Sequence, residues 1–200
     1  MILDMEEQKE FFKNHIATFT DYGNIKILDF KNPNNCHYRI RFLFEEDYCK
    51  LHISGDLGEL VATNYSNMSF EGFSDFVNNV GYFKEKIDCH SRQIYAYDYR
   101  KAKKDLLELI EECECEKELL DECYCDTIEE AIDEVLEDFS DYDGLGSKSY
   151  EKLSNIICDF WEEAGDIGKV STGILNLYML AFKLAMEQIK ENENDKSSNS

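Results

Sequence analysis

The apolar residues of this chain follow two different spacings in the two parts of the sequence. Before residue 100 they often occupy every second position, as where Tyr38, Ile40, Phe42 and Phe44 alternate with other side chains. Beyond residue 100 they recur at every third or fourth position, which is the period of an amphipathic helix. The pattern therefore predicts an α+β protein in which a sheet precedes a helical region.

The first part is expected to contain an N-terminal helix and an antiparallel sheet. Residues 5–19 place Phe11, Phe12, Ile16 and Phe19 at helical spacing. Four segments with strand-like alternation follow, and their connections are too short for parallel crossovers. A fifth short strand is predicted near residues 94–97. The four predicted strands cover residues 24–30, 38–44, 48–54 and 59–64, and short helical pieces are predicted over residues 69–77 and 82–87.

The second part is expected to be a helical lobe. Thr127 is a favourable N-cap for a helix whose apolar residues, Ile128 to Phe139, share one face. The last helix, residues 172–191, is apolar on most sides and is therefore expected to be central. The predicted parts are an α/β scaffold over residues 1–104, an acidic helical lobe over residues 105–191 and a disordered tail over residues 192–200.

Most of the net charge lies in one segment of the predicted lobe. The chain has 43 acidic and 21 basic residues, a formal net charge of −22. Residues 105–143 hold 18 of the acids and a single base, Lys117. Ordinary helix surfaces mix both signs, because like charges one turn apart destabilise a helix. A surface of one sign repels nucleic acids and anionic membranes, so its expected partners are cations or a basic protein surface.

The acidic segment has a charge density close to that of a nucleic acid. As one continuous helix it would be roughly 59 Å long, with a carboxylate about every 3.3 Å, near the roughly 3.4 Å phosphate spacing of a DNA strand. We expect the real element to bend near residues 123–126. Such a surface can imitate a phosphate backbone towards a groove rich in Lys and Arg. The predicted partner-binding residues are Glu111, Glu112, Glu114, Glu116, Glu118, Asp121, Glu122, Glu129, Glu130, Asp133, Glu134, Glu137 and Asp138.

Four of the eight cysteines form a C-x-C-x7-C-x-C pattern: Cys113, Cys115, Cys123 and Cys125. Four thiolates can hold zinc tetrahedrally. Residues two apart on a helix point about 200° away from each other, however, so a shared ion requires a helix break around residues 121–126. A zinc-binding regulatory protein is therefore one alternative function. The other interpretation of the pattern is four free thiols.

The remaining sequence predicts a cytoplasmic protein without a cofactor. The N-terminus lacks the pattern of a secretion signal, and the longest apolar stretch, residues 174–186, is too short to cross a bilayer. Cysteines in the cytoplasm are expected to be reduced. The four histidines are scattered and form no pattern with a nucleophile, so catalysis is not expected. A second alternative is an enzyme that modifies a host defence component.

The motif K-L-H-I-S-G-D-L-G-E-L-V, residues 50–61, is followed by a helical piece and then by Tyr82-Phe83-x-x-Lys86. This arrangement resembles a group of small proteins carried by phages and mobile elements of low-GC bacteria, in which an "ISGD-G" hairpin precedes a helix and a "YF-x-x-K" segment. The resemblance covers about residues 37–104. It implies an origin on a mobile element, and it implies no particular activity.

A mobile-element origin and the acidic segment together favour an anti-CRISPR protein. Several proteins of that class resemble DNA in charge and fill the cationic groove of a Cas effector, such as the DNA channel of Cas9. The leading hypothesis is an inhibitor that binds a Cas nuclease, with Cas9 as first choice, through its acidic helices and blocks DNA binding or cleavage in the bacterial cytoplasm. Residues 1–104 would then be a scaffold or a second contact surface.

Overall fold

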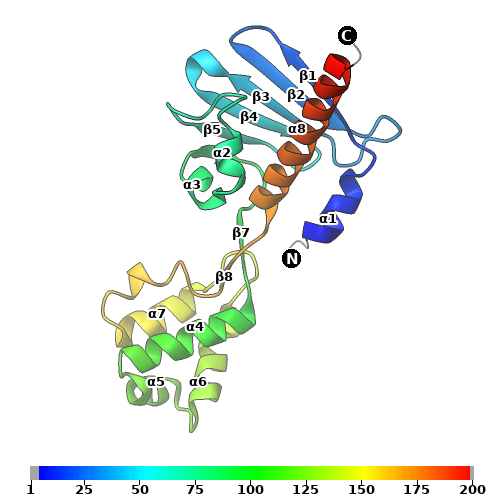
Figure 1. Ribbon diagram of the computed structural model, residues 1–200. Helices are drawn as coiled ribbons and strands as arrows, with labels where there is room; N and C mark the ends of the chain where they lie inside the picture. Colours follow the sequence, from blue (N-terminus) through cyan, green and yellow to red (C-terminus); the bar gives the residue numbers. More distant parts are fainter. Residues whose placement is uncertain (1–4, 199–200) are drawn as a thin grey trace. The chain divides into compact units, whose positions relative to one another are not determined.

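The structure is a computed structural model that describes residues 5–198, and its contacts divide the chain into two compact units (Figure 1). One unit, called the sheet unit, has residues 5–94 and 173–198 as its described part. The other, called the helical unit, comprises residues 95–172. The helical unit is thus an insertion in the sequence of the sheet unit. The predicted α+β class is confirmed.

The sheet unit contains a six-stranded antiparallel sheet whose strands follow one another in sequence order. Four of them confirm the predicted strands, and the two outer ones, β1 and β6, are additional to the prediction. The strands are β1 (Ile16–Asp21), β2 (Ile25–Lys31), β3 (Ile40–Glu45), β4 (Lys50–Gly55), β5 (Leu60–Thr63) and β6 (Ile87–His90).

The predicted N-terminal helix over residues 5–19 is too long. Helix α1 covers only Met5–Phe12, and the chain then enters β1, which pairs with β2 along its whole length. Aromatic residues in this stretch satisfy a helical spacing, but Thr18 and Thr20 are β-branched and favour a strand. The turn after Asp21 therefore closes a hairpin, where Gly23 has a φ of +84° and donates its N–H to the Asp21 carboxylate at 2.7 Å.

One face of the sheet carries the core of this unit. Alternate residues of the strands are buried there, including Phe42 and Phe44 of β3, both 0% exposed. The long helix α8 (Ile174–Ser198) lies on this face with the short helices α2 (Ser74–Val77) and α3 (Val80–Lys84) (Figure 1). Phe182 of α8 is 1% exposed and contacts the rings of both Phe42 and Phe44. The opposite face of the sheet is only partly buried.

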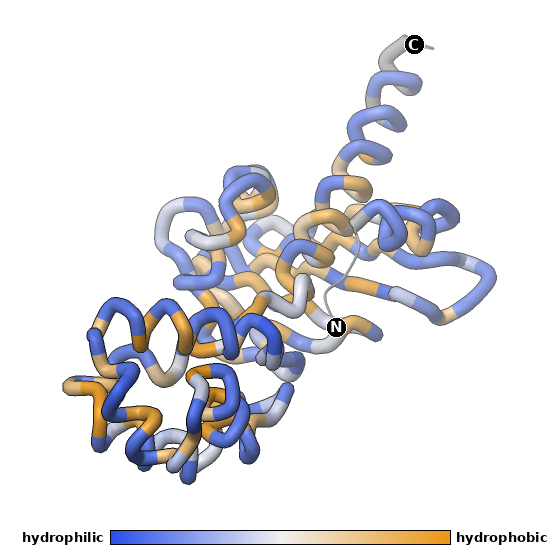
Figure 2. The backbone as a smooth tube through the Cα atoms, turned by 90° about the horizontal axis from the view of Figure 1, so that it is seen from below, coloured by the Kyte–Doolittle hydropathy of each residue, from blue (hydrophilic) through white to orange (hydrophobic). Residues whose placement is uncertain are grey.

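Helix α8 corrects two expectations about the end of the chain. We expected it in the acidic lobe, but its contacts place it in the sheet unit, because its broad apolar surface completes the aromatic core. The tail predicted to be disordered, residues 192–200, continues this helix as far as Ser198, and residues 199–200 lie outside the described part. The last turns are mostly hydrophilic (Figure 2), which explains why their composition suggested disorder.

The helical unit begins and ends in a short two-stranded sheet. Strand β7 (Tyr95–Tyr97), predicted as a fifth strand of the main sheet, pairs instead with β8 (Lys169–Ser171). Between them the helices surround a core of their own that includes Leu106, Leu119 and Leu153. The helices are α4 (Tyr99–Glu112), α5 (Glu116–Cys123), α6 (Ile128–Val135) and α7 (Ser147–Ile156). Two 3-10 turns, η2 (Leu136–Asp138) and η3 (Phe160–Glu162), also belong to this unit. The turn η1 (Glu46–Tyr48) belongs to the sheet unit.

The "ISGD-G" motif forms the turn after β4 and holds it against the start of β3. Asp56 donates its backbone N–H to the carbonyl of Arg39 at 2.9 Å, and its carboxylate accepts the Arg39 N–H at 2.9 Å. Gly55 has a φ of +138°, and a Cβ there would lie 2.1 Å from the Arg39 carbonyl oxygen. A glycine is therefore required for this turn to close.

We expect Gly55→Ala to lower the free energy of unfolding by about 2 kcal/mol or more, because the new methyl group meets backbone and the φ value is strained. Gly81→Ala is the matched control: Gly81 lies in α3, and a Cβ added there would face open space, with no side chain within 4 Å apart from its chain neighbours. That variant should stay within about 1 kcal/mol of the native protein. Urea unfolding of both variants measures the difference, and equal stabilities would contradict this account of the turn.

Candidate functional site

The predicted partner-binding carboxylates lie on three consecutive helices of the helical unit. They lie at the end of α4, at Glu114 in the link that follows it, along α5, and on α6 and η2. The inner faces of these helices carry Ile110, Leu119 and Ile132, which are at most 3% exposed. Figure 2 shows hydrophilic and hydrophobic residues alternating along these helices. The amphipathic pattern in the sequence therefore places the acids outward.

The acidic segment is broken twice and is not one long helix. Helix α4 ends at Glu112 and α5 at Cys123, and each is followed by a left-handed residue, Glu114 with φ 53° and Tyr124 with φ 54°. After each of these, a backbone N–H returns to the carbonyl five residues earlier, which is the closing bond of a Schellman motif. The expected bend near residues 123–126 is present. The break at Glu114 was not predicted, and it separates α4 from α5 within the acidic segment.

Ten of the thirteen predicted carboxylates are exposed and have neither an ion pair nor a side-chain hydrogen bond to any residue that the structure describes. Their negative charge is therefore not compensated within the unit. Lys117, the base of this segment, likewise forms no ion pair with a described residue. The ten are Glu111, Glu112, Glu114, Glu116, Glu118, Asp121, Glu122, Glu129, Glu130 and Glu137.

Two of the other three carboxylates tie helices together. Asp133 of α6 pairs with Lys103 of α4 and accepts a hydrogen bond from the Tyr99 hydroxyl at 2.7 Å. These contacts, led by Lys103, lower the pKa of Asp133. Glu134 pairs with Lys152 of α7 at 2.6 Å, and this hydrogen bond lowers its pKa. Both carboxylates therefore belong to the packing of the unit as well as to its surface.

Asp138 is the third, and its carboxylate satisfies the N-terminus of α7. It accepts the backbone N–H of Lys148 at 2.9 Å, and it also bonds the hydroxyl of Ser149. Burial acts to raise the pKa of Asp138, but these hydrogen bonds outweigh burial and lower it. A Cβ at Gly146 would lie 2.1 Å from the Asp138 carboxylate. The geometry thus assigns Asp138 a structural role.

The four clustered cysteines do not form the predicted tetrahedral site. Within residues 5–198, no group of three or more His, Cys, Asp or Glu side chains is arranged to hold a metal ion. Cys115 and Cys123 are buried, and their Sγ atoms point to the carbonyls of Ile110 and Ala131, each 3.8 Å away. Cys113 is exposed and Cys125 is half-buried.

The chemistry of these thiols also argues against zinc. Burial raises the pKa of Cys115, Cys123 and Cys125, and the Glu134 carboxylate raises that of Cys125 further. Zinc binds thiolates and displaces the thiol proton, so a raised thiol pKa lowers the affinity for zinc at neutral pH. The residues present do not fit the ion, and the zinc alternative loses its structural basis.

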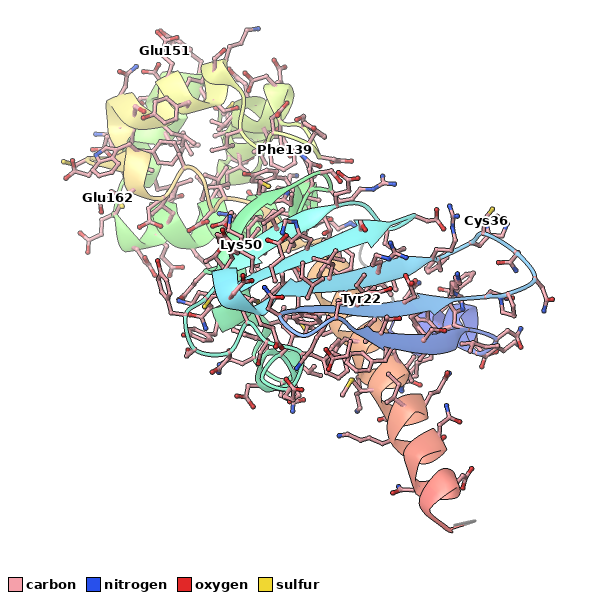
Figure 3. All side chains as sticks on the ribbon, turned by 90° about the horizontal axis from the view of Figure 1, so that it is seen from above. Tyr22, Cys36, Lys50, Phe139, Glu151 and Glu162 are labelled. Atoms are coloured by element: carbon pink, nitrogen blue, oxygen red, sulfur yellow. The ribbon has the colours of Figure 1, made fainter. Side chains whose placement is uncertain are left out.

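Large aromatic side chains accompany the acidic helices on the surface. Tyr124, which ends α5, is 96% exposed, and Trp161 of η3 is 65% exposed. Further acids lie near them in the sequence, and Figure 3 shows Glu151 of α7 and Glu162 of η3 projecting from the unit. Tyrosine and tryptophan are enriched in protein interfaces. The sequence contained both residues, but their exposure could not be read from its pattern.

The sheet unit holds a second group of charged residues that the sequence patterns did not single out. Arg41 of β3 makes a bidentate pair with Asp29 of β2 at 2.7 and 2.8 Å, and Arg39 makes one with Asp56 at 3.0 and 3.2 Å. Both pairs lie on the less buried face of the sheet. The alternation of Arg39 and Arg41 along a predicted strand was the one sequence feature that pointed to this group.

The histidines, by contrast, do not form a cluster. His15 lies in the core, where burial lowers its pKa, and His52 lies on the less buried face of the sheet.

Comparisons with protein-family models, with curated proteins and with solved structures find no match to this chain. Among the described residues, no helix is long and apolar enough to cross a membrane. The residues and their geometry are therefore the basis for assigning a function.

The arrangement of the cysteines predicts their reactivity. Cys36, Cys89, Cys113 and Cys158 are exposed and should react with a thiol reagent before Cys115 and Cys123. One equivalent of zinc should leave all rates unchanged, because no described group of ligands is arranged to hold it. Labelling followed by peptide mass spectrometry measures each rate. Cys36 is an internal control, because it is exposed and lies outside the cysteine cluster. If zinc slowed the labelling of Cys113 but not that of Cys36, the result would support a zinc site in the cluster.

Proposed function

We propose that this protein inhibits a nucleic-acid-processing enzyme, a Cas nuclease with Cas9 as first choice, by placing its acidic helices in the enzyme's basic groove. The observation that carries the proposal is the group of ten exposed carboxylates without a compensating charge. The helical unit has 24 acidic and 8 basic residues, a net charge of −16. Five of those bases are already paired with acids of the same unit.

A basic groove would supply the positive charge that this acidic surface lacks. Like charges on α4, α5 and α6 repel each other, and this repulsion destabilises the free protein. Lysine and arginine side chains that line a DNA channel would neutralise the carboxylates and release bound counterions. The exposed rings of Tyr124 and Trp161 add apolar contact area of the kind that stabilises an interface. Nucleic acid itself is not an expected partner, because it carries the same charge.

The two breaks in the acidic segment change the shape of the charged surface that would imitate a nucleic acid. A straight helix would present one line of charge, whereas three short helices packed on a common core present a broader patch. Such a patch matches a cationic channel wide enough to hold a duplex rather than a narrow groove that follows one strand. The channel that receives guide–target duplex in a Cas effector has this character. The proposal is therefore an occlusion of the channel by a folded acidic unit.

Four charge reversals test this proposal: Glu111→Lys, Glu112→Lys, Asp121→Lys and Glu122→Lys in one chain. These residues lie in the last turns of α4 and α5, where a positive charge is favourable to the helix dipole, so the fold should persist. We expect the native protein to inhibit DNA cleavage by a guide-loaded Cas9 at about one molecule per enzyme. The variant should require about a hundredfold more protein.

The matched control reverses four exposed carboxylates of the sheet unit, and it should inhibit like the native protein. These control changes are Asp47→Lys, Glu59→Lys, Glu187→Lys and Glu191→Lys. Both variants change the net charge equally, so a general charge effect would weaken both to the same extent and contradict the proposal. Inhibition far below one molecule per enzyme would indicate catalysis instead. Circular dichroism of both variants shows whether the helices persist.

A further inference from the structure

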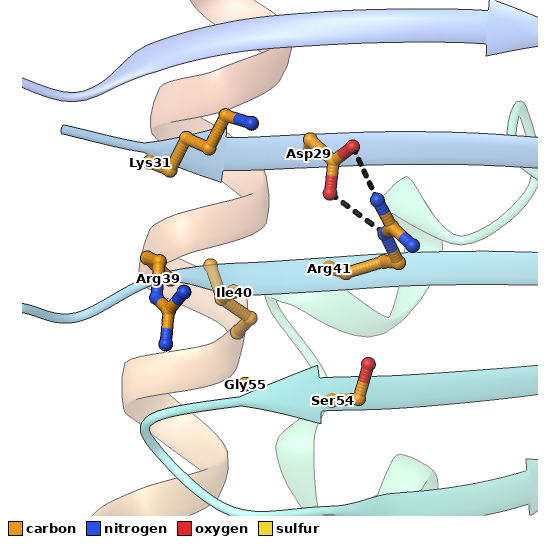
Figure 4. A pocket seen from close by; sticks show the side chains of 7 residues that line it. All are labelled: Asp29, Lys31, Arg39, Ile40, Arg41, Ser54 and Gly55. Atoms are coloured by element: carbon orange, nitrogen blue, oxygen red, sulfur yellow. Dashed lines mark hydrogen bonds and ion pairs between the residues drawn. The ribbon is translucent and has the colours of Figure 1, made fainter. Parts of the chain in front are cut away.

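The less buried face of the sheet contains a pocket of about 290 Å³ at the ends of β2, β3 and β4. Figure 4 looks onto this face, with α8 behind the strands. The pocket is lined by Asp29, Lys31, Arg39, Ile40, Arg41, Ser54 and Gly55. All seven belong to the sheet unit, so the pocket is separate from the acidic helices that carry the proposed function.

Three bases meet here in a strongly acidic protein. Lys31, Arg39 and Arg41 line the pocket, while its one lining acid is Asp29. Even when Asp56, the partner of Arg39, is included, the bases outnumber the acids. The whole chain has a net charge of −22, so a local excess of positive charge runs against its composition. The three side chains are exposed, and like charges held close together on a surface repel each other unless an anion compensates them.

The donors that line the pocket are only partly used. Arg41 donates from Nε and Nη2 to Asp29, and Arg39 donates from Nε and Nη2 to Asp56. The Nη1 group of each arginine has no acceptor among the described residues. Lys31 forms no ion pair, and the Ser54 hydroxyl no hydrogen bond, with any described residue. A ligand that supplies several acceptor oxygens would satisfy these groups together.

The two guanidinium groups are held in place before a ligand arrives. The bidentate pairs hold both guanidinium planes, since two parallel bonds fix orientation as well as distance. The Gly55–Asp56 turn is bonded to the backbone of Arg39, so the "ISGD-G" motif positions both Ser54 and Arg39. A donor set that is ordered in advance loses less entropy on binding. The motif therefore shapes the pocket as well as the turn.

We propose that this pocket binds a phosphate group. A phosphate offers several acceptor oxygens and two negative charges, which suits two guanidinium groups, one ammonium group and one hydroxyl. A carboxylate has only two oxygens and one charge. The phosphate is either free or the terminal group of a nucleotide, and both sources share the same chemistry. This site lies outside the proposed inhibitory surface, and its test requires no Cas enzyme.

The test is an NMR titration of the full-length protein with two probes, inorganic phosphate and adenosine 5′-monophosphate, at constant ionic strength set with chloride. We expect saturable shifts of the amide signals of Arg39, Arg41, Ser54 and Gly55. Lys31→Gln should weaken binding about tenfold, because it removes a charge-assisted hydrogen bond. Lys50→Gln is the matched control: Lys50 begins β4 on the same face (Figure 3) but does not line the pocket.

The comparison of probes identifies the source of the phosphate. Tighter binding of the nucleotide than of inorganic phosphate supports a nucleotide ligand, and equal affinities support recognition of the phosphate group alone. The proposal is overturned if neither probe gives saturable shifts at these amides. It is also overturned if Lys31→Gln and Lys50→Gln weaken binding equally, because the effect would then be one of general charge. The native spectrum of each variant serves as the check on folding.

Discussion

The packing of α8 on the inner face of the sheet is the contact on which the rest of the fold depends. The ring of Phe182 contacts Phe42, Phe44, Phe70 and Phe73, so the C-terminal helix fills the centre of a cluster built by earlier segments. Full burial of one such side chain stabilises a protein by roughly 1.5–3 kcal/mol. The sheet therefore needs a helix that lies some 80 residues later in the sequence than its last strand. The chain must therefore leave the sheet unit after residue 94 and return to it at residue 173.

That constraint makes the helical unit an insertion with a separate core. The two ends of the insertion pair as β7 and β8, and the core that includes Leu106 and Leu153 needs no residue of the sheet. Its outer face can therefore carry a function without affecting the aromatic cluster. Lys103 and Lys152 hold helices together through Asp133 and Glu134, while the surrounding carboxylates remain without a counter-charge. Such a distribution favours a basic partner, because binding would relieve repulsion that the fold does not.

The sequence predicted the parts of this molecule that follow from local periodicity. Alternation identified β2 to β5, and the apolar stripe after Thr127 identified α6, whose N-cap accepts the Glu130 N–H. Tertiary contacts decided the rest. The segment of β1 has helical spacing, but pairing with β2 makes it a strand. The apolar surface of α8 showed that this helix is central without showing which core it completes.

The same limit applies to the candidate sites. The sequence placed the carboxylates on outward helix faces, but it could not show that Asp138 caps α7, because Ser149 and Asp138 meet only after the chain turns back. The cysteine spacing suggested a metal site, yet a left-handed turn at Glu114 separates the environments of Cys113 and Cys115. The pocket near Arg39 and Arg41 depends on strand register, which side-chain alternation alone does not fix.

Competition between this protein and DNA for one enzyme tests the central claim most directly. Guide-loaded Cas9 would be bound to the labelled protein, and duplex DNA with a matching target and PAM would then be added in increasing amounts. If the acidic helices occupy the DNA channel, the DNA displaces the protein, and raising the protein concentration restores the complex. A stable assembly that contains the enzyme, the DNA and this protein together would contradict the account, because the two ligands would then occupy different surfaces.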